Sequence, residues 1–286
     1  AWTEAVAHWR DINAVAVTAR DGRRMPSAAH EYMLYQTLLG TWPLSTPLDD
    51  RYRDRIAAYA RKAAREGKQE TSWTNPDAEY EQSLDAFVRR ILSPDHAAFI
   101  ASMSAFASRA ARHGAAASLS QLVLKATLPG VPDFYQGTEL WDFSLVDPDN
   151  RRPVDFAARR ALFDDDAATS AWDSEAFKFH VTRRLLTLRN KFPDTFRFGT
   201  YQPVPLVDDR YVAFTRLYRQ HQVLVIVTRR FSRQQTSPET VIPRGTKVPR
   251  YNVLRNDELT RERSLTLAEI LHNDPAVVLS SAPLFA

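Results

Sequence analysis

The stretch Leu128–Phe156 reads LPGVPDFYQGTELWDFSLVDPDNRRPVDF and carries two of the eight glycines and four of the 17 prolines, too many for a regular helix. Neither a helical nor an alternating apolar period fits it. Pro129 and Gly130 end the helical pattern before it, and 136–138 predicts a turn. Between these breaks, 131–135 predicts one short buried strand. A strand that ends in a long polar and aromatic loop is typical of a barrel or an open α/β sheet, whose binding site lies where the strands end.

The residues before this stretch predict a mostly helical region over 1–127. Three helices are expected to begin where a capping side chain precedes a proline, because proline has no N–H to leave unpaired in the first turn. The three pairs are Thr46-Pro47, Asn75-Pro76 and Ser93-Pro94. The helix after Ser93-Pro94 is expected to end at Gly114, and a separate helical run, 118–127, then leads into the expected strand.

The residues after the stretch predict one more helix and then a β domain. An amphipathic helix is expected over Asp173–Phe192, and its apolar stripe consists of Phe177, Val181, Leu185 and Leu188. From Asp194 onward, short β-branched and aromatic runs between turn residues predict a small antiparallel β domain of sandwich type. We therefore expect an α+β multidomain protein with a helical region (1–127), a strand, loop and helix (128–193), and a C-terminal antiparallel β-sandwich domain (194–286).

Composition argues against several classes of protein. The 38 basic and 34 acidic residues give a net charge of only +4, which is too small to indicate nucleic acid or a membrane surface as partner. The absence of cysteine excludes disulfides and thiolate metal sites, and the seven histidines show no metal-ligand spacing, so no cofactor is expected. No apolar run reaches the roughly 20 residues of a membrane helix. The first ten residues, AWTEAVAHWR, show no signal peptide and no initiator Met, so we expect a cytoplasmic protein of which this chain is a part.

The central stretch resembles a family pattern. It matches the form Gly-x-Pro-x-x-Tyr-x-Gly-x-Glu through Gly130, Pro132, Tyr135, Gly137 and Glu139. This pattern resembles the last barrel strand and the following loop of the alpha-amylase family of glycoside hydrolases. The segments TLLGTWPL (37–44) and RKAAREGKQETSWTNPDAEYE (61–81) also resemble one branch of that family. The chain departs from it at 67–70, where Gly-Lys-Gln-Glu replaces the more usual Ala-Lys-x-His, so no role of that histidine carries over.

The resemblance implies a fold and an activity. The fold would be a helical insertion, the last strand and helix of a (β/α)8 barrel, and an all-β C-terminal domain. Members of the branch act on maltooligosaccharides and convert the reducing-end α-1,4 bond into an α,α-1,1 bond by intramolecular transglycosylation. Such retaining chemistry uses two carboxyl groups about 5 Å apart. The resemblance implies that these lie upstream, in an N-terminal catalytic barrel portion of the same protein, so this chain alone is expected to be inactive. Two alternatives stay open: a fragment of another hydrolase of the family, and a non-catalytic glucan-binding module.

Four residues of the central loop are candidates for substrate binding. Asp133 and Glu139 either hold the loop by accepting backbone hydrogen bonds, the preferred interpretation, or face sugar hydroxyls. Tyr135 and Gln136 come just after the expected strand, where barrel enzymes line their pockets, so they either line a pocket or pack.

Two further candidates lie outside that turn. Trp73 either stacks on the apolar face of a glucose ring or fills a gap between helices. A charged cluster either forms an ion-pair network that braces the loop, the preferred interpretation, or contacts sugar directly. Its members are Asp147, Asp149, Asn150, Arg151 and Arg152, of which Asp149 and Arg152 are the candidates for substrate contact.

Overall fold

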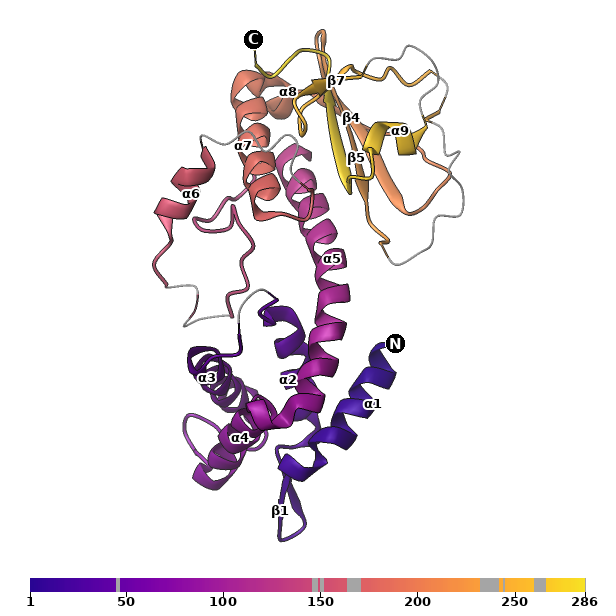
Figure 1. Ribbon diagram of the computed structural model, residues 1–286. Helices are drawn as coiled ribbons and strands as arrows, with labels where there is room; N and C mark the ends of the chain where they lie inside the picture. Colours follow the sequence, from indigo (N-terminus) through magenta and orange to yellow (C-terminus); the bar gives the residue numbers. More distant parts are fainter. Residues whose placement is uncertain are drawn as a thin grey trace. The chain divides into compact units, whose positions relative to one another are not determined.

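The computed structural model describes residues 1–44, 47–145, 149, 152–163, 171–231, 242–243, 245–259 and 266–285. They fold as two compact units (Figure 1). The first comprises Ala1–Ala111 with Phe143–Arg152, and the second comprises Arg112–Asp142 with Pro153–Ala286. Helix α5 (Ala97–Thr127) contributes residues to both units, and each unit has a hydrophobic core of its own.

The first unit is helical apart from one small hairpin. Its elements are α1 (Trp2–Asn13), η1 (Ala14–Ala16), β1 (Thr18–Arg20), β2 (Arg23–Met25), α2 (Ala28–Thr41), α3 (Asp50–Gly67), α4 (Ala78–Ile91), η2 (Pro94–His96) and the first part of α5. Trp9 of α1 is the centre of its core and makes edge contacts with the rings of Tyr35, Phe99 and Phe106 at 5.5 to 6.2 Å. The expectation of a helical N-terminal region is therefore confirmed for the described residues.

Two of the expected helix starts are wrong. Helices α3 and α4 are capped by Asp49 and Asp77, each of which accepts a hydrogen bond from the backbone N–H three residues later. Both caps lie after the expected capping residue and its proline, and each aspartate accepts from an unpaired N–H of the first turn. Ser93 does act as a cap before Pro94, but of the short η2, and Thr46 lies outside the described residues.

The expected helix end at Gly114 is also wrong. Helix α5 continues through Gly114 as a single helix of 31 residues, so the predicted separate run 118–127 is its last part. A glycine inside a helix is less favourable than alanine by about 1 kcal/mol. Alanines at 110–111 and 115–117, the strongest helix formers, surround this glycine and offset that penalty.

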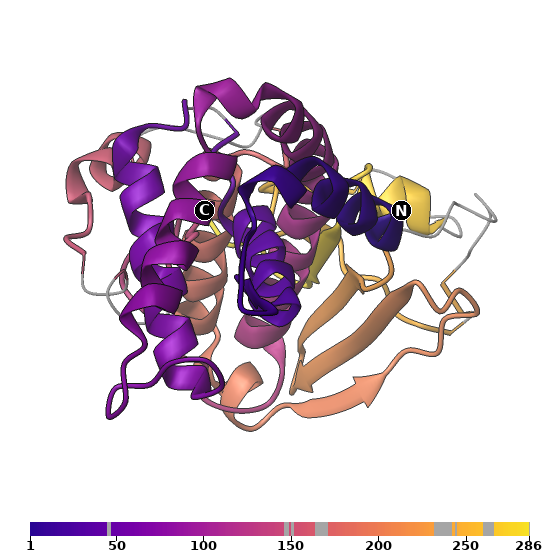
Figure 2. The same cartoon turned by 90° about the horizontal axis from the view of Figure 1, so that it is seen from below.

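The second unit contains one antiparallel sheet, shown by the orange and yellow strands that lie side by side in Figures 1 and 2. Its strands are β3 (Thr200–Pro203), β4 (Tyr211–Tyr218), β5 (His221–Thr228), β6 (Tyr251–Asn252), β7 (Asp257–Glu258) and β8 (Ala276–Ser280), in the order β3-β4-β5-β8-β6-β7. Strands β4 and β5 form a hairpin, and Arg219 in its turn has a positive φ of 53°. The predicted antiparallel sheet is confirmed.

The predicted sandwich differs from what is found. Alternate residues of β5 face two different layers. Val223, Val225 and Val227 pack with α7 (Glu175–Lys191) and the last part of α5. Leu224 and Ile226 pack with the short helix α9 (Leu267–Leu271). Among the described residues of 194–286, a helix therefore lies where a sandwich has its second sheet. The sequence pattern shows only that both faces of a strand are covered, and a helix covers a face as well as a sheet does.

The expected strand over 131–135 is not formed. These residues have no regular secondary structure, and Val131 is 99% exposed. A strand exists only where a neighbouring strand completes its hydrogen bonds, and a parallel barrel strand needs such partners. The described part of the chain offers no parallel partner, since its strand pairs are antiparallel. Helices α6 (Phe156–Phe163) and α8 (Pro193–Arg197) complete the second unit.

A buried arginine joins the elements of the second unit. Arg216 of β4 is 1% exposed. Its guanidinium group donates hydrogen bonds of 3.0 to 3.2 Å to four backbone carbonyls, those of Thr127, Phe196, Gly199 and Thr200. These carbonyls lie at the end of α5, in α8 and at the start of β3, so one side chain links three chain segments.

We expect Arg216→Met to lower the free energy of unfolding of the second unit by about 3 kcal/mol, because buried carbonyls would lose their donors. Urea unfolding followed by circular dichroism measures this. The matched control is Arg197→Met, which removes an exposed arginine of α8 and should change stability by less than about 0.5 kcal/mol. Equal effects of the two substitutions would contradict the assignment.

Candidate functional site

The turn in the central loop is confirmed. Both the backbone N–H and the hydroxyl of Thr138 donate to the carbonyl of Tyr135, at 3.3 and 2.7 Å. Gly137 has a φ of 92°, which favours glycine, and a Cβ there would lie 3.3 Å from a methyl group of Val154. The turn therefore fixes the loop backbone directly after Tyr135.

Glu139 holds this turn. Its carboxylate accepts hydrogen bonds from the N–H of Gly137 at 3.0 Å and from Nε of Arg159 at 2.8 Å. Arg159 also donates to the carbonyl of Gly137 at 2.5 Å, so Glu139 and Arg159 together bind both backbone groups of this residue. Burial alone would raise the pKa of Glu139, but Arg159 and the backbone donors outweigh it and lower the pKa below its usual value. These contacts are those of the loop-holding interpretation.

Three predicted residues are exposed beside this turn. Tyr135 is 56% exposed, and Asp133 and Gln136 are also exposed. Their side chains form no hydrogen bonds with the rest of the chain that the structure describes. They therefore offer a phenol, a carboxylate and an amide to an incoming ligand, and such groups recognise sugar hydroxyls.

A buried lysine lies behind the same loop and was not predicted. Lys178 of α7 is 7% exposed; its Nζ donates to the carbonyl of Leu140 at 2.6 Å and lies 5.0 Å from the ring centroid of Trp141. Burial lowers the pKa of Lys178 to about 8. The sequence shows one apolar stripe on α7, whereas the structure buries residues on most of its faces, so nothing in the pattern marks this lysine.

The predicted charged cluster forms an ion-pair network in the first unit. Asp149 is buried, and its carboxylate accepts from Nε of Arg55 at 2.6 Å and from the N–H of Leu145 at 2.9 Å. Arg152 pairs with its other oxygen at 2.5 Å. Burial alone would raise the pKa of Asp149, but the Leu145 N–H and the Arg55 guanidinium lower it overall. Asp147, Asn150 and Arg151 lie outside the described residues.

Trp73 is exposed and fixed. It is 55% exposed, so it does not fill a gap between helices. Its indole N–H donates to Glu66 at 2.9 Å, and the guanidinium of Arg65 lies 4.7 Å from the ring centroid. Arg65 is itself held by two hydrogen bonds to Glu81. These contacts hold the ring in place, as stacking on a sugar requires.

The seven predicted residues thus fall into two groups. Asp133, Tyr135, Gln136 and Glu139 lie together in the second unit, and Trp73, Asp149 and Arg152 lie in the first. Arg55, Arg159 and Lys178 support these groups and were not predicted. Arg55 is 94 residues from Asp149 in sequence, so no local pattern connects the two. Within the described residues, no group of three or more metal-ligating side chains and no helix able to cross a membrane is found.

We expect Asp149→Asn to loosen the loop around Leu145, because an amide holds two guanidinium groups less strongly than a carboxylate does. The amide of Leu145 should exchange its hydrogen about tenfold faster. Hydrogen exchange followed by mass spectrometry or NMR measures this. The control, Asp54→Asn, breaks an exposed ion pair with Arg89 and should leave that exchange unchanged. Unchanged exchange in Asp149→Asn would rule out the bracing role.

Because Lys178 is buried, the free energy of unfolding should depend on pH. The unfolded chain holds this proton up to about pH 10.4, whereas the folded chain releases it near pH 8, so the unfolded state binds more protons between these values. The free energy of unfolding should therefore gain a contribution as the pH rises from 8 to 10, and Lys178→Met should lack it. Chemical unfolding of both proteins at several pH values tests this. Parallel curves for the two would show that Lys178 does not titrate there.

Comparison with known proteins gives clear relatives. No protein-family model matches the chain. It is 38% identical over 223 residues to a putative maltooligosyl trehalose synthase of Mycobacterium tuberculosis (strain ATCC 25618 / H37Rv), an alignment that covers 76% of this chain and 27% of the relative. The corresponding protein of strain CDC 1551 / Oshkosh matches equally.

Solved structures agree with the sequence matches. A crystal structure of maltooligosyl trehalose synthase is 28% identical with a TM-score of 0.79, covering 98% of this chain and 35% of that one. The maltooligosyltrehalose synthase from Arthrobacter ramosus is 28% identical with a TM-score of 0.74, covering 95% and 34%. The chain thus spans about 27% of the length of its curated relatives. In both sequence and fold, it is homologous to a part of the maltooligosyltrehalose synthases.

Proposed function

We propose that this chain is the C-terminal part of a maltooligosyltrehalose synthase. The complete enzyme would convert the reducing-end α-1,4-glucosidic bond of a maltooligosaccharide into an α,α-1,1 bond, as an intramolecular transglucosylase. The observation that carries this proposal is the structural match, which includes 98% of this chain but only 35% of the synthase. The remainder of the enzyme, an N-terminal catalytic barrel portion, would be the partner of this chain.

The proposed role of the chain is to form one wall of the active site. Asp133, Tyr135 and Gln136 would contact sugar hydroxyls, because their side chains are exposed and form no hydrogen bonds with the described residues. Trp73 would stack on a glucose ring. The carboxylates of Glu139 and Asp149 are already held by arginines, so they would mainly brace the loops, and Arg152 is the more exposed member of its pair.

The lowered pKa values of Glu139 and Asp149 support an upstream location for the catalytic acid. A general acid at an anomeric centre needs a carboxyl whose pKa is raised toward neutrality. The pKa values of Glu139 and Asp149 are lowered instead, so both are ionised at neutral pH and neither can donate a proton. We therefore assign the acid/base to the N-terminal portion, place there also the nucleophile that must lie about 5 Å from it, and expect the isolated chain to be inactive.

The same assignment explains the unpaired stretch 131–135. In the complete enzyme it would be the last strand of a (β/α)8 barrel, with the neighbouring strands supplied by the N-terminal portion. The three regions expected from the sequence, 1–127, 128–193 and 194–286, would then be a helical insertion, the last barrel unit and the C-terminal β domain. The cysteine-free composition fits a cytoplasmic enzyme, and we propose neither a cofactor nor a nucleic-acid or membrane partner.

The proposed reaction requires that water be kept out. After cleavage, the released glucose would turn and present its anomeric hydroxyl to the glycosyl-enzyme in place of water. A loop held by Glu139, Arg159 and Lys178 is suited to retain that glucose, because a fixed backbone leaves fewer routes for solvent. In a hydrolase of the same family, water would take the place of this hydroxyl.

Titration of the chain with maltopentaose, combined with an assay for reducing ends, tests the proposal. We expect binding by calorimetry without loss or gain of reducing ends. Loss of reducing ends on the isolated chain would refute the upstream location of the carboxylates, and a gain would indicate a hydrolase. A non-catalytic glucan-binding module would also bind without turnover. Extending the chain by the upstream part of its reading frame separates these: a synthase gains the ability to consume reducing ends, and a binding module does not.

We expect Tyr135→Ala to weaken maltopentaose binding about tenfold, because an aromatic ring at a sugar site contributes both apolar area and a hydroxyl. The control, Phe198→Ala, removes an equally exposed ring of the same unit. It should leave the dissociation constant within a factor of two. Calorimetric titration of both variants measures this, and unchanged affinity in Tyr135→Ala would remove this residue from the site.

A further inference from the structure

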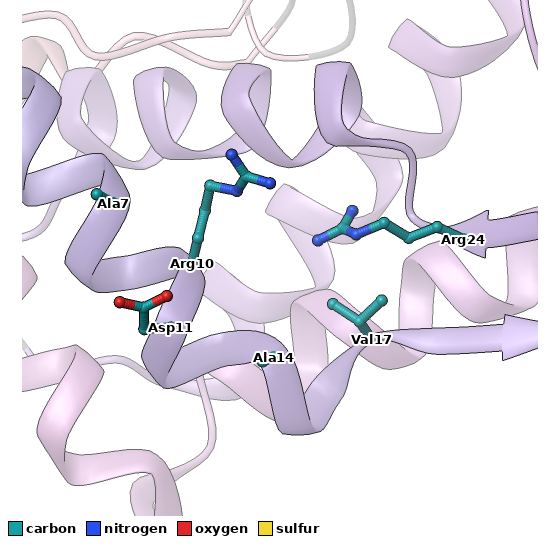
Figure 3. Close-up of a pocket in the computed structure, with 6 residues that line it drawn as sticks. All are labelled: Ala7, Arg10, Asp11, Ala14, Val17 and Arg24. Carbon is teal, nitrogen blue, oxygen red and sulfur yellow. The ribbon is translucent and has the colours of Figure 1, made fainter.

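A pocket of about 480 Å³ lies in the first unit, at the end of α1 and the start of the hairpin. Six residues line it: Ala7, Arg10, Asp11, Ala14, Val17 and Arg24. Figure 3 shows the guanidinium groups of Arg10 and Arg24 extending toward one another from α1 and β2. Neither the predicted sugar-binding residues nor the residues that brace them line this pocket.

The two arginines surround one buried carboxylate. Glu31 of α2 is fully buried; one of its oxygens accepts from the hydroxyl of Tyr35 at 2.7 Å. The other oxygen lies 2.5 Å from a terminal nitrogen of Arg24 and 3.8 Å from Nε of Arg10. Both guanidinium groups therefore lie near the same oxygen atom. Glu31 fixes the position of Arg24 by a hydrogen bond before any ligand arrives, which reduces the entropy lost on binding, whereas it attracts Arg10 only by charge.

The arginines keep unused hydrogen-bond donors. A guanidinium group carries five N–H groups. Arg24 uses one with Glu31 and one with the carbonyl of Pro26. For Arg10, the distance of 3.8 Å to Glu31 is too long for a hydrogen bond, and the described residues offer its side chain no other acceptor. Several donors at the pocket are thus available.

The charges at the pocket are those of two guanidinium groups and two carboxylates, of which only Glu31 is buried. Two positive guanidinium groups share the single negative charge of Glu31. Asp11 also lines the pocket, but it is exposed, and in Figure 3 its carboxylate lies on the other side of the Arg10 stem from Arg24. Solvent screens an exposed carboxylate more strongly than a buried one. An oxyanion between the two guanidinium groups would accept hydrogen bonds from the donors that they leave unused.

The shape of the pocket indicates more than a free ion. A guanidinium fork matches two oxygens of a phosphoryl group, and two forks can hold three oxygens from different sides. The methyl groups of Ala7, Ala14 and Val17 form an aliphatic wall, and the volume exceeds that of one inorganic phosphate. We propose that this pocket binds a small phosphate monoester, with the phosphoryl group between Arg10 and Arg24 and the organic part against the aliphatic wall.

Calorimetric titration of the chain with phenyl phosphate, inorganic phosphate and benzoate tests the proposal. Phenyl phosphate should bind saturably and more tightly than inorganic phosphate, because only the ester reaches the aliphatic wall. Benzoate should bind at least tenfold more weakly than phenyl phosphate, because a carboxylate has two oxygens instead of three. Equal binding of phenyl phosphate and benzoate, or no saturable binding of phenyl phosphate, would overturn the proposal.

Arg10→Gln is the informative variant, because Arg10 forms no hydrogen bond that the fold needs. It should weaken phenyl phosphate binding at least tenfold, and Arg10→Lys should restore part of the affinity. The control, Arg51→Gln, removes the same charge from an exposed position of α3 and should change the affinity less than twofold. Equal weakening in Arg10→Gln and Arg51→Gln would mean that only overall charge attracts the anion. Circular dichroism and the melting temperature show whether each variant is folded.

Discussion

The second unit depends on the four carbonyls that Arg216 holds. A guanidinium group buried without a carboxylate partner is unfavourable unless its donors meet acceptors. Here the acceptors are four backbone carbonyls: that of Thr127 at the end of α5, that of Phe196 in α8, and those of Gly199 and Thr200 at the start of β3. The arginine donates to all four of them and thereby joins α5, α8 and β3.

The same chemistry organises the loops, which have no backbone ladder to hold them. Asp149 with Arg55, and Glu139 with Arg159, each combine one ion pair with a hydrogen bond from a loop N–H. A carboxylate used in this way is kept ionised, so the residues that build the walls of the candidate site are unsuited to proton transfer. This separation of roles is the physical basis for our proposal that the catalytic groups lie outside this chain.

The sequence predicted the classes of element better than their boundaries. The helices of the first unit, the turn at 136–138 and the antiparallel sheet follow from local patterns. Gly114 did not end α5, because neighbouring alanines favour the helix, and aspartates rather than X-Pro pairs set the starts of α3 and α4. The sandwich is not confirmed among the described residues: the apolar pattern of β5 shows that two faces are covered, and in the structure helices cover them.

By itself, the sequence determined the family resemblance and the position of the loop and its turn, because turn chemistry and motif spacing are local. Only the tertiary structure showed that Arg55 reaches Asp149, that Lys178 is buried behind Leu140, and that Arg10 and Arg24 meet at Glu31. These contacts join residues of different elements, and a periodic pattern reports the face of its own element without identifying what packs against it. The physical reason is that burial and charge pairing depend on which segments meet in space.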